Sequence, residues 1–161
     1  DEETMREIAK KVGMGALKFA DLSNHRSKDY NFDVERFCSF EGKTGPYGQY
    51  TAVRVAAVLA KCEGITSKIN LPEGDVQRDL FMFLTEYQTA VKGAVADLAP
   101  NVLVDYIYQL AVLLNKYYHE YKVATEADET KKASRVETLK LSFKLMKTLL
   151  DIVGIEIPAR M

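Results

Sequence analysis

Apolar residues recur at three- and four-residue steps through nearly every long segment of this chain, and no segment alternates apolar and polar residues as a strand does. The pattern is clearest near the carboxyl end, where Leu139, Phe143, Met146 and Leu150 follow one another at such steps. This spacing gathers apolar side chains on one face of a helix, and that face must be buried against another element. The pattern therefore predicts an all-α helical bundle of five or six helices.

A chain of 161 residues with 47% hydrophobic composition is long enough for one domain with a sizeable core. Asp33 and Asp75 are expected to be helix N-caps, and Gly154 is expected to end the last helix in a left-handed conformation. We expect helices over residues 2–24, 33–40, 46–62, 75–98, 101–121 and 131–153, with polar loops at 63–74 and 123–130 and a short tail from residue 155.

The expected helices also predict which side chains are buried. The third helix should bury Val53, Ala56 or Ala57, and Leu59 or Ala60; the fourth should bury Leu80, Phe83 or Leu84, Tyr87, Val91, Val95 and Leu98; and the fifth should bury Leu103, Ile107, Leu110, Leu114 and Tyr117 or Tyr118.

The stretch from Ser39 to Arg54 combines a glycine- and proline-rich turn with the start of an apolar-periodic segment. Its Gly42-Lys43-Thr44 sequence matches the end of a phosphate-binding loop, but such a loop needs a glycine where Phe37 stands. Pro46 suits the first turn of a helix, because its missing N–H would have no helical partner there. The stretch therefore predicts a turn that leads into a helix and presents two tyrosines.

The net charge of −1 gives no overall basic field that would indicate nucleic acid. Residues 131–161, however, hold seven Lys or Arg against three Asp or Glu, a local excess of +4 that could face an anionic partner or simply be solvated. Cys38 and Cys62 are too few for a zinc motif or a disulfide framework, which favours a reduced, cytoplasmic protein. No apolar run reaches the length of a membrane span. Because the chain starts at Asp1 inside an expected helix, we expect it to be a piece of a longer protein.

The residues needed for catalysis are hard to find in this chain. His25 and His119 lie in different segments, without a carboxylate pattern around both, and neither cysteine sits in a nucleophile motif. The acidic residues form no set with metal-ligand spacing. We therefore expect no catalytic residue, no metal and no cofactor site within the chain itself.

Three separated segments resemble the carboxyl-terminal part of the arginyl-tRNA synthetases, which are class I aminoacyl-tRNA synthetases. The first, residues 12–33, reads VGMGALKFADLSNHRSKDYNFD and contains the family's Ala-x-Lys-Phe and Arg-x-x-x-Tyr-x-Phe-Asp runs. The second, residues 40–54, is similar to the family pattern Glu-Gly-Asn-Thr-Gly-Pro-Tyr-x-Gln-Tyr-x-x-x-Arg, with Lys43 in place of Asn. The third is the end of the chain, where Pro158-Ala159-Arg160-Met161 matches the family's Pro-x-Arg-Met finish.

The resemblance implies an α-helical anticodon-binding domain of the class I synthetase type over residues 33–161, preceded by a junction over residues 1–32 that leaves a catalytic domain. It implies a parent enzyme that attaches arginine to its tRNA with ATP and Mg²⁺, whose His-x-Gly-His and Lys-Met-Ser-Lys motifs are absent from this sequence. The implied partners are the anticodon loop of arginine tRNA and the enzyme's own catalytic domain, with no membrane and no DNA. This chain alone is expected to bind tRNA and to catalyse nothing.

Candidate tRNA-binding residues come from the second and third segments. Tyr47, Tyr50 and Arg54 fall on one side of the expected helix, where the rings could stack on unpaired bases. The resemblance extends this role to Arg160 and Met161. Gln49, as a positioning residue, and Arg135 are further candidates. For each tyrosine, core packing is an equally good interpretation, and Gln49 could serve the turn alone. Beside Arg135, Lys131 and Lys132 could also hold phosphates. For Lys140, Lys144 and Lys147 we favour a solvated helix face.

A second hypothesis needs no nucleic acid. The chain could be a helical protein–protein or interdomain module that uses the apolar face of its first helix, which contains Met5, Ile8, Val12 and Phe19.

Overall fold

The computed structural model describes all residues 1–161, and every regular element in it is helical. The all-α prediction is therefore confirmed. The elements are α1 (Glu2–Leu22), α2 (Val34–Phe37), α3 (Gly45–Lys61), α4 (Asp75–Thr85), α5 (Tyr87–Ala96), α6 (Asn101–Glu120), a short 3-10 turn η1 (Val123–Thr125) and α7 (Glu129–Ile152). No helix is long and apolar enough to cross a membrane.

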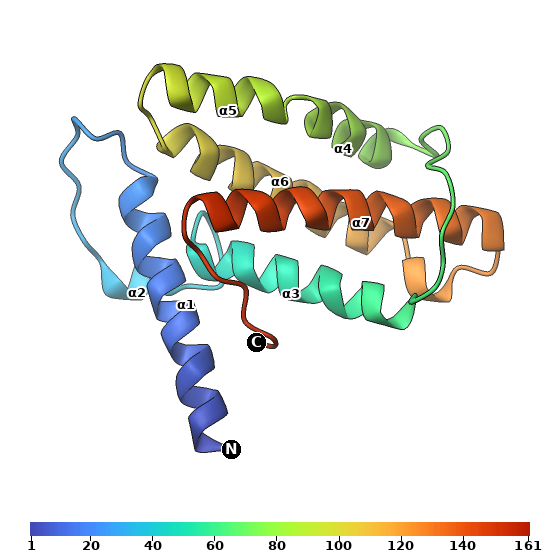
Figure 1. Ribbon diagram of the computed structural model, residues 1–161, viewed down its shortest axis with the longest axis horizontal. Helices are drawn as coiled ribbons and strands as arrows, with labels where there is room; N and C mark the ends of the chain where they lie inside the picture. Colours follow the sequence, from blue (N-terminus) through green and yellow to red (C-terminus); the bar gives the residue numbers. More distant parts are fainter.

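Helix α6 is the centre of the bundle and contacts α3, α4, α5 and α7. Helices α3 and α7 lie against each other and against α6, while α4 and α5 cover α6 from the opposite side (Figure 1). Helix α1 crosses the bundle steeply, and its amino-terminal half projects beyond the other helices (Figure 1). The carboxyl-terminal tail turns back from α7 and ends near α1 and α3 (Figure 1).

The apolar stripes expected in the two longest central helices form the core. In α6, Leu103, Ile107, Leu110, Leu114 and Tyr117 are all buried, as predicted. In α7, Leu139, Met146 and Leu150 are buried and Phe143 is half-buried. These helices are surrounded by others on most sides, so the stripe read from their sequences coincides with the face that is buried.

Side-chain caps define several helix ends. The Asp33 carboxylate accepts from the backbone N–H of Arg36, so Asp33 is an N-cap as predicted. Thr44 caps α3 in the same way, through the N–H of Tyr47, and Pro46 lies in the first turn. Gly154 has φ +70 and ends α7 in the left-handed region, also as predicted. The prediction for Asp75 was wrong, because Gly74 is the N-cap of α4 and no side chain caps that helix.

The predicted buried face of α3 was only partly right. Ala52 and Val55 are buried, whereas Val53, Ala56 and Leu59 are half-buried and Ala57 and Ala60 are exposed. The side of α3 that turns inward also carries Gly48, where an added Cβ would be in ordinary van der Waals contact with Ile107 and Met146, at 3.8 and 3.9 Å. Helices α6 and α7 both pack on this side of α3, so their position selects the buried face.

The single helix expected over residues 75–98 is two helices. It breaks at Glu86, whose N–H bonds to Phe83 O, and α5 starts with the next residue. The break changes the phase of the apolar stripe, so that Ala94 is the residue α5 buries, while Val95 and Leu98 are 68% and 70% exposed.

Candidate nucleic-acid interface

The first turn of α3 places Tyr47 between the core and the surface. Its ring packs against the core and lies 5.7 Å from the ring of Tyr108. Its hydroxyl accepts a hydrogen bond of 3.0 Å from the amide of Asn115, which also donates to Thr51 at 2.9 Å. Tyr47 is thus held by α6, and only part of its surface faces solvent.

Tyr50 and Arg54, one turn apart on α3, form an exposed group with two aromatic residues from elsewhere in the chain. The Arg54 guanidinium lies 4.7 Å from the Tyr50 ring centroid and 4.8 Å from that of Tyr118, on α6. Phe40 meets the Tyr50 ring edge-on at 6.4 Å. We call Phe40, Tyr50, Arg54 and Tyr118 the aromatic–arginine face.

Two hydrogen bonds orient the arginine of this face. Arg54 Nη2 donates to the Tyr50 hydroxyl at 2.9 Å, and Nη1 donates to Asn115 Oδ1 at 3.1 Å. The rings themselves stay accessible, with Phe40 52% exposed and Tyr50 and Tyr118 36% exposed. Exposed rings beside a fixed guanidinium offer stacking surfaces for unpaired bases and a positive charge for a phosphate.

Sequence reasoning missed Phe40, Asn115 and Tyr118. Phe40 begins the segment that resembles the synthetase family, so its place in that pattern was an available signal. Asn115 and Tyr118 lie on α6, more than sixty positions from Tyr50 in sequence, and only the packing of α6 against α3 brings them to this face.

The structure excludes direct contact of Gln49 with RNA, and its expected positioning role stays a prediction. Its side chain is fully buried, and Nε2 donates to Lys11 O at 3.0 Å and to Glu156 O at 2.7 Å. It therefore joins α3 to α1 and to the carboxyl-terminal tail, and it offers no surface for direct contact with RNA.

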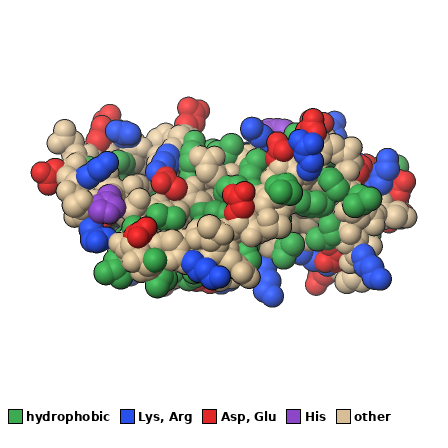
Figure 2. All heavy atoms as spheres, turned by 90° about the horizontal axis from the view of Figure 1, so that it is seen from above, with side chains coloured by type: hydrophobic (Ala, Val, Ile, Leu, Met, Phe, Trp, Pro, Cys, Tyr) green, Lys and Arg blue, Asp and Glu red, His purple; other side chains and the backbone are tan.

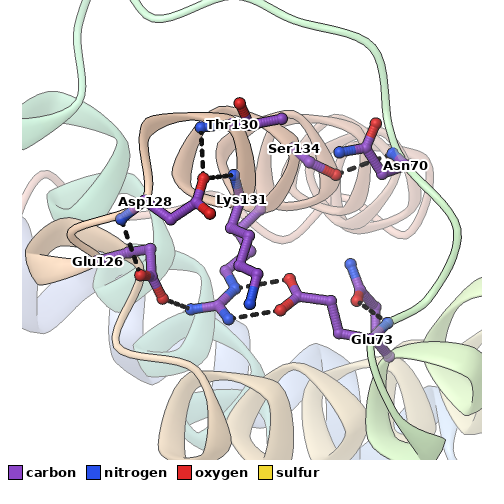
Figure 3. Close-up of polar contacts among 9 residues, drawn as sticks. Asn70, Glu73, Glu126, Asp128, Thr130, Lys131 and Ser134 are labelled. Carbon is purple, nitrogen blue, oxygen red and sulfur yellow. Dashed lines mark hydrogen bonds and ion pairs between the residues drawn. The ribbon is translucent and has the colours of Figure 1, made fainter.

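The structure also corrects the expected role of Arg135, which is only 8% exposed. Its guanidinium donates to both oxygens of Glu73, at 2.9 and 2.7 Å, and to Glu126. It also lies 4.8 Å from the Tyr121 ring centroid. Figure 3 shows Glu73 and Glu126 reaching this guanidinium from two different loops. Arg135 therefore holds these loops on α7 and is not free to grip a phosphate.

This ion cluster shifts the titration of its members. The side-chain hydrogen bond from Arg135 holds the pKa of Glu73 below its usual value of 4.5. The pKa of Glu126 is also lowered, chiefly because its carboxylate accepts a hydrogen bond from the backbone N–H of Asp128 (Figure 3). Both carboxylates are therefore ionised in the folded protein at neutral pH.

Arg160 and Met161, at the end of the tail, are exposed, Met161 by 36%. The residues just before them are held in place: Ile155 is 1% exposed, and Pro158 is also buried. The structure therefore leaves both predicted contact residues accessible.

The lysines near the predicted sites have partners inside the protein. Lys43, which replaces the family's usual Asn, pairs with Asp105 on α6. On α7, Lys140 donates to Ile65 O and to Glu137, and Lys147 pairs with Asp151 at 2.6 Å. These contacts agree with a solvated helix face better than with a phosphate grip.

The α4–α5 side of the molecule carries charges of both signs, with apolar side chains gathered toward the α4 end (Figure 2). A groove of about 600 Å³ lies between α4, α5 and α7, lined by Phe81, Leu84, Tyr87 and Leu141 among others. Its lining is mainly apolar, and none of its residues belongs to the aromatic–arginine face.

Comparison with solved structures finds the same fold in synthetases. The arginyl-tRNA synthetase of Thermus thermophilus matches 96% of this chain with a TM-score of 0.84 and 29% identity, over 27% of its own length. That of Plasmodium falciparum matches with a TM-score of 0.82 at 20% identity, a likeness in fold alone.

Similar sequences carry the name arginine–tRNA ligase. The protein of Alkaliphilus oremlandii is 42% identical over the whole of this chain, and that of Maricaulis maris is 39% identical over 96% of it. The chain spans only 28% and 26% of the length of these relatives. The resemblance inferred from the three sequence segments is therefore confirmed, while the boundary at residue 32 stays a prediction. The family model described as the DALR anticodon binding domain matches residues 48–161, more than half of the chain, and this chain accordingly belongs to that family.

Proposed function

We propose that this chain is the anticodon-binding part of an arginine–tRNA ligase and that it binds the anticodon loop of arginine tRNA through the aromatic–arginine face. The observation that carries the proposal is the exposed set of rings around Arg54, most of it inside the segment that the family model matches. Tyr50 and Tyr118 can each stack on a base, and Arg54 can hold a phosphate. Tyr47, Arg160 and Met161 complete the proposed contacts.

The longer enzyme would attach arginine to this tRNA in the cytoplasm, using ATP and Mg²⁺ held by a catalytic domain. Nothing in the described residues forms a group of three or more His, Cys, Asp or Glu that could hold a metal ion. In this proposal the role of the chain is recognition, and the chemistry belongs to the rest of the enzyme.

The Tyr50→Ala variant is expected to bind arginine tRNA about tenfold more weakly, since stacking of a base on an aromatic ring contributes about 1–3 kcal/mol. Filter binding at low salt, with arginine tRNA and a tRNA changed at the central anticodon base, measures both affinity and discrimination. The matched control is Tyr87→Ala, because Tyr87 is 37% exposed, much like Tyr50, but lies on the α4–α5 side.

Two results would argue against this proposal. Equal binding of the two tRNAs by the unmodified chain would exclude base readout, because phosphate contacts alone are blind to sequence. Equal losses in Tyr50→Ala and Tyr87→Ala would remove the aromatic–arginine face from the interface.

A second candidate function is docking of α1 on another protein domain. Of the face predicted for this role, Phe19 is buried against the core, Ile8 and Val12 are half-buried and Met5 is 61% exposed. Met14 and Leu17, on another side of α1, are 44% and 45% exposed, and the helix projects from the bundle (Figure 1). In the proposed enzyme the exposed part of α1 would face the catalytic domain.

In the isolated chain we expect the exposed apolar residues of α1 to cause weak self-association. Light scattering should show a dimer that Met5→Glu with Leu17→Glu abolishes; a chain that stays monomeric at high concentration would count against an apolar docking surface.

A further inference from the structure

Gln49 is a fully buried amide at the point where three separate segments meet. Its two amide hydrogens are both used, one on Lys11 O of α1 and one on Glu156 O of the tail. Its Oε1 is buried with no hydrogen-bond partner. An unpaired buried acceptor is unfavourable, and an apolar side chain of similar size would avoid it. The two donated hydrogen bonds are therefore the reason to have glutamine here.

The surrounding backbone leaves space for this amide at the crossing of α1 and α3. A Cβ added to Gly15 would lie 2.5 Å from the Gln49 side chain. A Cβ added to Gly45 would lie 2.3 Å from Gly15 O. The two glycines thus bring the helices into backbone contact and leave room for the Gln49 side chain beside them.

The Gln49 bond is central to how the tail is held. Lys18 donates to Gly154 O, and Lys11 approaches the Glu156 carboxylate at 3.6 Å. Both lysines extend from α1 at the surface, whereas Gln49 bonds the tail from inside. After the buried Pro158 only Ala159, Arg160 and Met161 remain, so the position of the last two residues depends on where residues 154–158 are held.

We infer that Gln49 is a positioning residue for RNA recognition: it holds the carboxyl-terminal tail at Glu156, and so fixes where the exposed Arg160 and Met161 emerge from the protein. The role in RNA recognition rests on the proposed function, whereas the way in which Gln49 holds the tail rests on the two hydrogen bonds. Because one amide bonds both α1 and the tail, a shift of α1 on α3 would also disturb one of the contacts that hold the tail. Gln49 itself never touches the RNA.

The test compares Gln49→Met, which keeps the volume and removes the donors, with deletion of Arg160 and Met161 and with both changes together. We expect each to reduce the preference for arginine tRNA over the tRNA changed at the central anticodon base by about tenfold, the size of effect that loss of one charge-assisted contact can have. The combined variant should lose no more than either alone, because both changes remove the same contact.

The control for folding is Gln77→Met. Gln77 is 1% exposed, accepts from the Glu73 N–H at 2.9 Å and, like Gln49, has one unpaired buried amide atom, but it lies on α4 away from the tail. The Gln77→Met variant should be destabilised to a degree similar to Gln49→Met, but it should keep its tRNA preference. Hydrogen exchange supplies a readout without RNA: the amide of Ile155, which donates to Leu150 O at 2.8 Å, should exchange faster in Gln49→Met and at the unmodified rate in Gln77→Met.

Should Gln49→Met fail to fold, Lys18→Met removes a second tail contact from the surface and is expected to give a smaller change of the same kind. Full tRNA preference in Gln49→Met, or losses that add in the combined variant, would overturn the inference. Unchanged exchange at the Ile155 amide would overturn it without any reference to RNA. Equal binding of the two tRNAs by the unmodified chain would instead overturn the proposed function, so the two failures are distinguishable.

Discussion

The Arg135→Met variant is expected to unfold with a free energy about 3 kcal/mol lower than that of the unmodified chain, since removing one partner of a buried ion cluster leaves charges without compensation. The Glu73 and Glu126 side chains, which are 24% and 21% exposed, would face each other without the guanidinium. The methionine keeps most of the volume, so the loss reports the charge and its hydrogen bonds. Urea unfolding monitored by circular dichroism measures it.

The control is Arg78→Met, because Arg78 pairs with Asp75 and Asp79 at 3.4 and 3.7 Å while remaining 62% exposed. Exposed pairs contribute at most about 1 kcal/mol, so this variant should be nearly as stable as the unmodified chain. Equal losses in the two variants would show that burial of the cluster does not matter.

The pH dependence of stability gives the same variant a second readout. The folded-state pKa of Glu73 is depressed, so its contribution is present above the usual pKa of 4.5 and is lost as the pH falls through the folded value. The unmodified chain should therefore lose stability as the pH falls below about 5, because Glu73 binds its proton more tightly in the unfolded chain than in the folded one. Arg135→Met removes the main cause of the shift and should show a shallower loss.

The Gly45→Ala variant is expected to lose about 3 kcal/mol, the upper end of what overpacking costs. The new Cβ would lie 2.3 Å from Gly15 O, 2.6 Å from Gly15 C and 2.9 Å from Ala16 N, all of them backbone atoms of α1. Backbone atoms cannot rotate aside as a side chain can, so α1 must move off α3 and disturb the packing of Phe19, which is 1% exposed. Thermal unfolding and tRNA preference should both report the change.

The matched control is Gly13→Ala in α1, where an added Cβ meets nothing within 4 Å. Alanine is favoured over glycine inside a helix by about 1 kcal/mol, so this variant should be more stable than the unmodified chain. A Gly45→Ala variant with unchanged stability and unchanged tRNA preference would mean that neither property depends on the close approach of α1 and α3.

The helices that the sequence predicted best are those that other helices enclose on most sides. Helix α6 is enclosed by its neighbours, so its apolar residues and its buried face coincide. The caps at Asp33 and Gly154 were also predictable, since each depends on local hydrogen bonding or on a backbone conformation that glycine favours. Helix α3 behaves differently, because it buries Gly48 and Ala52 where two other helices come close.

The candidate site also contains residues that the sequence could predict and residues that it could not. Tyr50 and Arg54 were found because one helical turn separates them, which is a local relation. Phe40 and Tyr118 reach the same face from other elements, and no local pattern joins α3 to residue 118. Gln49 and Arg135 were candidates for the RNA site, as a positioning residue and a phosphate contact, yet each side chain donates to partners far away in sequence.

The sequence by itself determined the helical class, the core stripes of α6 and α7, several helix ends and the family to which the chain is similar, because periodicity, capping and motif order are properties of neighbouring residues. Only the tertiary structure decided which polar side chains face solvent and which hold the protein together. Burial depends on what another helix places against a residue, as α1 and the tail do at Gln49 and as two loops do at Arg135. A hydrogen-bonding side chain looks the same in sequence whether its partner is RNA or a backbone carbonyl a hundred residues away.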